Sequence, residues 1–200
     1  MEFTEKEEKI NLAAEKYGEF MDIILPGWKT DPNSKDTPNR VAKAYITELF
    51  KSIHNEEGLK ITTFDNIKKY DGIVLQSNIS IKSLCSHHHQ AISGIAHIAY
   101  IPSKDGKIIG LSKLNRIADY FARMPQVQEN LTEEIHDRVN ELCEDNQGVA
   151  VLIKAKHLCC SHRGILHDSD MQTVKLSGAF KENDSARSEL YQLIDYANKK

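Results

Sequence analysis

The stretch Gly148-Val149-Ala150-Val151-Leu152-Ile153-Lys154-Ala155 is strongly apolar and predicts a buried strand. His157-Leu158-Cys159 follows it almost directly. Residues 72–84 alternate apolar and polar side chains, which is typical of a half-buried strand, and they lead into Cys85-Ser86-His87-His88. Both expected strands therefore run into segments rich in cysteine and histidine, the residue types that bind transition metals.

The elements around these two strands predict an α+β fold. The expected core runs strand, strand, helix, helix, strand, strand, over residues 72–84, 94–102, 112–123, 126–144, 148–155 and 171–180. Amphipathic helices are expected at 4–25, 37–53 and 184–197, with N-caps at Thr37 and Ser112 and with Pro38 in the first helical position. We expect a helical N-terminal region over 1–58 and a catalytic domain over 59–200.

Composition narrows the function classes. A net charge of −3 and a pI near 6.3 argue against a general nucleic-acid binder. No apolar run approaches membrane-spanning length, and the acidic, polar N-terminus is no secretory signal, so we expect a cytoplasmic protein. In a reducing compartment, the cysteines flanked by histidine favour metal binding over disulfides, whereas Cys143 is expected to be an ordinary thiol in a helix.

Cys85, His88 and Cys159 are the candidate metal ligands. Cys85 and His88 stand three apart, a spacing that lets two side chains bind one metal, and Cys159 can add a third ligand. One histidine with two cysteines is a ligand set of catalytic zinc sites, which keep a fourth position for water. The neighbouring His87 and His157 can move protons. On chemistry alone, Cys160 and His89 remain possible ligands, and the whole cluster can also be incidental.

Two further segments have both a functional and an ordinary interpretation. A polyphosphate can be bound together by Ser112 at a helix start, by Lys113 and Arg116, which stand three apart, and by Arg163. A capped helix with solvated cations is the more frequent case. In Gln126-Val127-Gln128-Glu129, the carboxylate can accept two N–H groups from guanine. It can equally be a favourable charge at a helix N-terminus, and sequence does not decide between these.

The segments, in this order, resemble the GTP cyclohydrolase I family. The resemblance runs from about Thr37 to Phe180. Its pieces are Thr37-Pro38-Asn39-Arg40-Val41-Ala42-Lys43, Cys85-Ser86-His87-His88, His97-Ile98-Ala99-Tyr100-Ile101-Pro102, Gly110-Leu111-Ser112-Lys113 with Arg116-Ile117, Pro125-Gln126-Val127-Gln128-Glu129, Gly148-Val149-Ala150-Val151, and His157-Leu158-Cys159 with Arg163-Gly164.

This resemblance implies a tunnelling fold, ββααββ, whose subunits form a toroid, with a homodecamer expected and active sites between subunits. It implies that GTP is opened at C8 of guanine, with loss of formate, to give 7,8-dihydroneopterin triphosphate. The implied roles are zinc binding by Cys85, His88 and Cys159, proton transfer by His157 with help from His87, guanine binding by Glu129 with Gln128 beside it, and triphosphate binding by Lys43, Ser112, Lys113, Arg116 and Arg163.

The chain departs from the family pattern at Ser86, where the family normally has glutamate. His89-Gln90-Ala91-Ile92 also differs, and Asn130 replaces a common arginine. A serine cannot replace a carboxylate as a charged acceptor beside metal ligands. We expect activity at a changed rate. The alternative is a divergent paralogue, of which two kinds are considered. One is a 7-cyano-7-deazaguanine reductase-like enzyme with a nucleophilic cysteine and a nicotinamide cofactor, and the other is a non-catalytic GTP-binding regulator.

Overall fold

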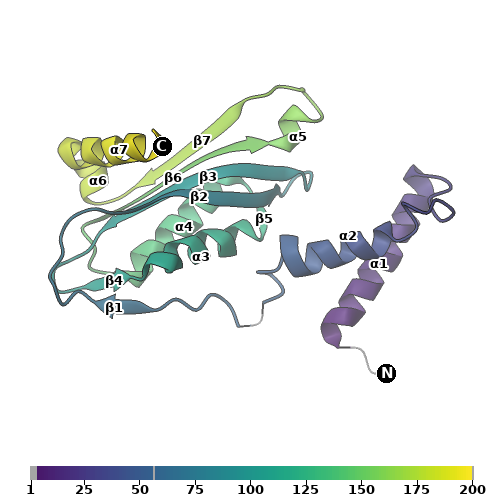
Figure 1. Ribbon diagram of the computed structural model, residues 1–200, viewed down its shortest axis with the longest axis horizontal. Helices are drawn as coiled ribbons and strands as arrows, with labels where there is room; N and C mark the ends of the chain where they lie inside the picture. The colour runs from purple at the N-terminus through teal and green to yellow at the C-terminus, as the bar shows by residue number, and fades with distance from the viewer. Residues whose placement is uncertain (1–3, 56, 200) are drawn as a thin grey trace. The chain divides into compact units, whose positions relative to one another are not determined.

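A computed structural model describes residues 4–55 and 57–199 of the chain (Figure 1). The chain divides into two compact units, Met1–Glu56 and Glu57–Lys200. The first unit is helical, and the second holds the strands together with the remaining helices.

The first unit begins with α1 (Glu5–Ile24), close to the predicted 4–25. Thr4 and Glu7 form a capping box, in which each side chain bonds the backbone N–H of the other residue. The buried stripe of α1 contains Ala14, Gly18 and Met21. Ile24, the last residue of α1, is 56% exposed.

The second predicted helix is shorter than expected and starts at a different cap. It consists of α2 (Thr37–Ala44) followed by a π-helical turn, η1 (Tyr45–Leu49), so the prediction to residue 53 was too long. The N-cap is Asp36, not Thr37, because the Thr37 N–H already bonds the carbonyl of Ser34 and places Thr37 inside the first turn.

The second unit is built on a five-stranded sheet in the order β5-β2-β3-β6-β7. Its strands are β2 (Val74–Cys85), β3 (Ala91–Ile101), β5 (Pro125–Gln126), β6 (Gly148–His157) and β7 (Asp170–Leu176). Neighbours are antiparallel except β5, which pairs in parallel with β2. A separate ribbon joins β1 (Thr63–Asp65) to β4 (Lys107–Ile109). Strands as short as β1, β4 and β5 carry too little pattern to predict.

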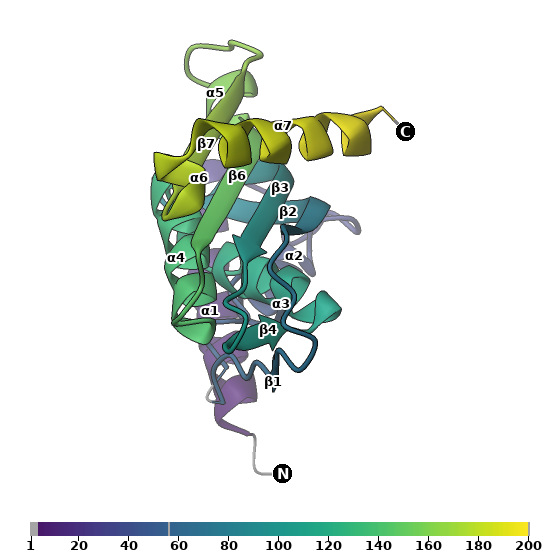
Figure 2. The ribbon, with the colours of Figure 1, turned by 90° about the vertical axis from the view of Figure 1, so that its left-hand side faces the viewer.

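Helices cover both faces of this sheet (Figure 2). The helices α3 (Leu111–Ala122) and α4 (Gln128–Leu142) pack on one face, and α6 (Ala179–Glu182) and α7 (Asp184–Asn198) pack on the other. Apolar side chains of the first face include Ile81, Ile98, Leu114, Ile135 and Val151, and those of the second include Ala99, Phe180, Leu190 and Ile194. This curled α+β arrangement agrees with the tunnelling fold and with the predicted strand–helix order.

Several predicted boundaries need correction. Gly110, not Ser112, is the N-cap of α3, because the Lys113 N–H already bonds the carbonyl of Gly110. The last strand ends at Leu176, and Ala179 and Phe180 belong to α6, where Phe180 is buried. Among the described helices, none is long and apolar enough to cross a membrane.

The contact of β3 with β6 depends on Gly94. This residue pairs with Ala155, and a Cβ at position 94 would lie 2.0 Å from the carbonyl oxygen of Lys154. No real side chain can approach so closely. The absence of a side chain therefore lets the two central strands pair in this register.

Candidate metal centre and active site

Strand register brings the two halves of the Cys/His motif together. β2 pairs with β3 so that Leu84 lies opposite Ala91, and β3 pairs with β6 so that Ile92 lies opposite His157. The turn after β2 and the helix α5 (Leu158–Ser161) after β6 therefore lie at the same end of the sheet. Segments far apart in the sequence become neighbours there.

The turn after β2 is fixed by its own backbone. The Cys85 N–H bonds the Gln90 carbonyl at 2.9 Å, and the His89 N–H bonds the Cys85 carbonyl at 2.8 Å. The Ser86 N–H bonds the carbonyl of Gln126 at 2.9 Å, which ties the turn to β5. These bonds hold the ligand-bearing turn in one shape before any metal binds.

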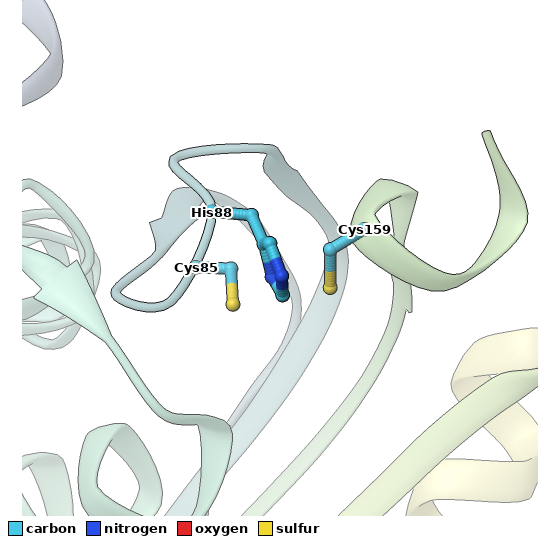
Figure 3. Close-up of side chains that lie close together, drawn as sticks. All are labelled: Cys85, His88 and Cys159. Atoms are coloured by element: carbon cyan, nitrogen blue, oxygen red, sulfur yellow. The ribbon is translucent and has the colours of Figure 1, made fainter. Parts of the chain in front are cut away.

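Cys85, His88 and Cys159 point toward one another (Figure 3). Each offers one ligand atom, and the three atoms lie within 4.8 Å of one another. Ligands of a tetrahedral zinc, bound at about 2.0–2.3 Å, lie roughly 3.5–3.8 Å apart, so small side-chain movements suffice to close on an ion. Cys85 is buried, Cys159 is half-buried and His88 is exposed. The group can bind a metal ion and leaves one side open.

The thiol of Cys159 is protonated without a metal. Burial raises its pKa to about 11, and the nearby thiols of Cys85 and Cys160 contribute in the same direction. A metal binds the thiolate form, so metal binding must release this proton. Affinity for the ion is therefore expected to rise with pH.

Arg163 contacts His88, one of the three candidate metal ligands. Its Nη1 is 3.1 Å from Nε2 of His88. A guanidinium only donates hydrogen bonds, so Nε2 accepts here. A metal held through Nε2 of His88 would use the same lone pair, so Arg163 and the metal would compete for this nitrogen.

The other cysteines and histidines of the two motifs surround this group. Nδ1 of His87 is 3.7 Å from the sulfur of Cys85, and the sulfur of Cys160 is 4.0 Å from that of Cys159. Cys160 and His89 are exposed and do not belong to the group of three converging ligands. Ser86 is exposed.

His157 is held by a buried glutamine. Its Nε2 lies 2.8 Å from Oε1 of Gln128. Burial lowers the pKa of His157, while the negative charge of Glu129 opposes that shift. The ring is therefore mainly neutral at physiological pH, the state in which a histidine can accept a proton.

Gln128 and Glu129 occupy different environments although they are neighbours in α4. Gln128 is fully buried, whereas Glu129 is exposed in the first turn. Glu129 lines a cavity of about 160 Å³ together with Thr132, Glu133, Thr173, Val174 and Lys175. A carboxylate at the edge of this cavity can accept hydrogen bonds from a ligand.

The comparison with known proteins assigns the chain to a family. The family model described as GTP cyclohydrolase I matches residues 19–195. The chain belongs to the GTP cyclohydrolase I family. The expected family membership is thereby confirmed.

Two curated relatives named GTP cyclohydrolase 1 show the extent of the similarity. The one from Flavobacterium johnsoniae is 40% identical over 193 residues, covering 96% of this chain and 82% of the relative. The one from Shewanella denitrificans is 43% identical over 164 residues, covering 82% and 74%. A solved archaeosine synthase QueF-Like, in the apo form, matches 54% of this chain and 94% of its own at 17% identity and a TM-score of 0.43, a likeness too weak to bear on function.

The side chains of the second unit that the family resemblance assigns to triphosphate do not all lie at the Cys85, His88 and Cys159 cluster. Ser112, Lys113 and Arg116 lie in the first two turns of α3, and the end of α3 leads through β5 to the metal-binding turn. A 12-residue helix is about 18 Å long, so Ser112 and Lys113, in its first turn, lie at the end away from Cys85, and Arg116 lies near its middle. Among the assigned residues that the structure describes in the second unit, Arg163 contacts the cluster, through His88. Lys43 lies in the first unit, exposed on α2.

Sequence reasoning missed the links of Gln128 to His157 and of Arg163 to His88. One signal was present for the first. Gln128 stands three residues before Leu131 and seven before Ile135, on the stripe of α4 that is buried. A polar residue on an apolar stripe indicates a buried side chain that needs partners. The contact of Arg163 with His88 left no signal in residue spacing or periodicity from which it could have been predicted.

Proposed function

We propose that the protein is a zinc-dependent GTP cyclohydrolase, which opens the imidazole ring of GTP, releases C8 as formate and forms 7,8-dihydroneopterin triphosphate. The observation that carries this proposal is the convergence of Cys85, His88 and Cys159, with His157 only two residues from the last ligand. The curated relatives named GTP cyclohydrolase 1 support the choice of GTP as substrate.

The donor set fits zinc. Two thiols and one imidazole are a ligand set of catalytic zinc sites with an open position. When bound, zinc lowers the pKa of water to near 7 and polarises the group under attack. The contribution of the chain is to hold the ligands in a turn and a short helix, each fixed by backbone bonds.

Proton transfer is assigned to His157, with His87 assisting. His157 is half-buried and mainly neutral, so it can take a proton during attack at C8 and return one when the ring opens. His87 is exposed, and its Nδ1 is near the Cys85 sulfur, which places it at the same open side.

Substrate binding is assigned to residues on both sides of the open position. Glu129 accepts from N1–H and the 2-amino group of guanine, and Gln128 lies beside it. The triphosphate is bound by Lys43, Ser112, Lys113, Arg116 and Arg163. Because the start of α3 is remote from the cluster of its own chain, α3 of a neighbouring chain is expected to complete the site. This supports a homo-oligomer, a decamer by family resemblance, with active sites between subunits.

The test is direct. Purified protein, loaded with zinc, is incubated with GTP, and the product is oxidised and dephosphorylated so that a fluorescent pterin can be detected. Formate release is measured in parallel. Absence of both products with stoichiometric zinc bound would exclude this enzyme activity. GTP binding without turnover would favour the regulator, and turnover that needs a reduced nicotinamide but no zinc would favour the reductase-like paralogue.

A further inference from the structure

Gln128 lies at the start of α4 with its side chain completely buried. Its amide nitrogen is 3.2 Å from the carbonyl oxygen of Ile153 and 3.2 Å from that of Met171. The same nitrogen is 3.1 Å from the hydroxyl oxygen of Thr173. The side chain thus joins α4 to both β6 and β7.

These contacts fix which way the amide points. Backbone carbonyl oxygens only accept hydrogen bonds, so the NH₂ group of Gln128 must face Ile153 and Met171. The reversed amide would place its oxygen 3.2 Å from each of two carbonyl oxygens, where it has no hydrogen to share. Oε1 of Gln128 therefore faces His157, 2.8 Å from Nε2.

The orientation of the amide decides the form of the imidazole. An amide oxygen only accepts, so Nε2 of His157 must carry the hydrogen. A neutral imidazole has one N–H, which leaves the lone pair on Nδ1. This nitrogen has no hydrogen-bond partner within residues 4–55 and 57–199. Since no buried side-chain nitrogen or oxygen in that part of the chain lacks a partner, Nδ1 is accessible from outside the protein.

We propose that Gln128 is a positioning residue that holds His157 in the Nε2–H tautomer and makes Nδ1 the nitrogen that exchanges protons with substrate. The inference rests on the proposed function, in which His157 moves protons. In this scheme, Nδ1 accepts one proton, the ring becomes doubly protonated while Nε2–H stays on Gln128, and Nδ1 then returns the proton to a leaving nitrogen. Gln128 acts through His157, and its buried amide does not reach the substrate.

The neighbouring threonines hold the glutamine in place. Thr132 donates to the backbone carbonyl of Gln128 at 2.8 Å, and its hydroxyl is 2.6 Å from that of Thr173. Partners of this kind, behind a catalytic group, typically account for about 10–100-fold in activity when they are removed.

The test compares two substitutions of Gln128 in the zinc-loaded protein. Gln128→Met keeps the length but removes the acceptor. Gln128→Glu keeps an acceptor toward His157 when its carboxyl is protonated and the O–H donates to the carbonyls of Ile153 and Met171. NMR of protein labelled with ¹⁵N-histidine reports which ring nitrogen carries the hydrogen. The signals of His157 are identified because they are absent from the spectrum of His157→Gln. We expect Nε2–H in the wild type and in Gln128→Glu, and a tautomer mixture in Gln128→Met with kcat reduced about 10–100-fold and little change in KM.

His136→Leu is the matched control. His136 is also buried on α4, and its Nε2 is 3.0 Å from the hydroxyl of Ser177, just beyond β7. Its loss disturbs the packing of α4 beside the end of β7 without touching His157. Wild-type kcat and an unchanged tautomer in Gln128→Met would overturn the proposal, as would an equal loss of kcat in His136→Leu. If the wild type does not act on GTP, the proposed function fails, while the NMR result still decides the tautomer.

Discussion

The end of the sheet that carries Cys85, His88 and Cys159, called the metal end below, differs from the start of α3 in how its polar side chains are held. At the metal end, the turn after β2, His88 and His157 all take part in hydrogen bonds within the chain. At the start of α3, the side chains of Ser112, Lys113 and Arg116 show no hydrogen bond or ion pair to any residue that the structure describes. The groups assigned to chemistry are held within the chain, whereas the groups at the start of α3 that are assigned to anion binding remain available to a ligand.

This difference suggests a division of labour. Catalytic groups need a defined geometry before substrate arrives, because correct placement supplies much of the rate enhancement. Cations that bind a flexible polyphosphate can be ordered by the ligand. Substitutions at the metal end should therefore alter metal content or turnover, and those at the start of α3 should mainly alter substrate affinity.

The largest effect is expected for Cys159→Ala, which removes a metal ligand. We expect loss of both bound zinc and pterin formation, measured by metal analysis and fluorescence. His157→Ala is the contrast, because it should lose turnover and keep zinc. Full zinc in Cys159→Ala would make Cys160 the ligand, and zinc loss from folded His157→Ala would add His157 to the ligand set.

Glu129→Gln should produce the next largest effect. A carboxylate accepts hydrogen bonds from two neighbouring N–H groups of guanine, one on each oxygen. A carboxamide has only one accepting oxygen, and its NH₂ group donates. Sites built on such hydrogen bonds discriminate by about 10⁴-fold in favourable cases, so kcat/KM for GTP should fall toward that extent. Glu141→Gln makes the same change at the other end of α4, outside the cavity. Equal kinetics in the two variants would remove Glu129 from the site.

Ser86→Glu should raise turnover. The carboxylate restores the charged acceptor that is usual beside the ligands, and changes of that kind alter metal affinity or activity by about 10–100-fold. The Ser86→Gln variant, which has a similar size but no charge, should gain less. Turnover and zinc affinity are measured together. A decrease in both with Ser86→Glu would show that this active site is adapted to serine.

Arg116→Ala should have the smallest effect and should separate binding from chemistry. Loss of one charge-assisted hydrogen bond costs about 1.5–3 kcal/mol, so KM for GTP should rise roughly tenfold or more with little change in kcat. Because Arg116 is exposed, the unfolding free energy should stay within about 0.5 kcal/mol of wild type. Arg138→Ala is the control, because it removes the same charge from α4, at a residue that is not assigned to the site. A fall in kcat without a change in KM would contradict the division of labour.

Much of the fold was readable from the sequence because its long elements carry strong periodicity. The strand predicted over residues 148–155 lies within β6 and is buried except at Leu152 and Lys154, and the helix predicted over 126–144 contains α4. The errors fall at helix starts, where one backbone bond decides the cap, and in strands of two or three residues, where no period can be seen. The caps depend on single local bonds, whereas the short strands depend on pairing with distant segments.

The candidate site was only partly readable for the same reason. Spacing identified Cys85, His88 and Cys159, and the structure brings the three together. Which residue supports His157 depends on the packing of α4 against β6 and β7. The separation of Arg116 from the cluster depends on the direction of α3. Neither can be derived from local spacing in the chain.

The missing side chain at Gly94 has a consequence for how this protein can evolve. Gly94 lies two positions along β3 from Ile92, which pairs with His157 at the metal end. A methyl group at position 94 would push β3 away from β6 and, with it, the Cys85 turn away from Cys159. A position with no reactive group thus sets the spacing of the ligands. A substitution there is therefore expected to weaken metal retention while the sequence motifs themselves stay unchanged.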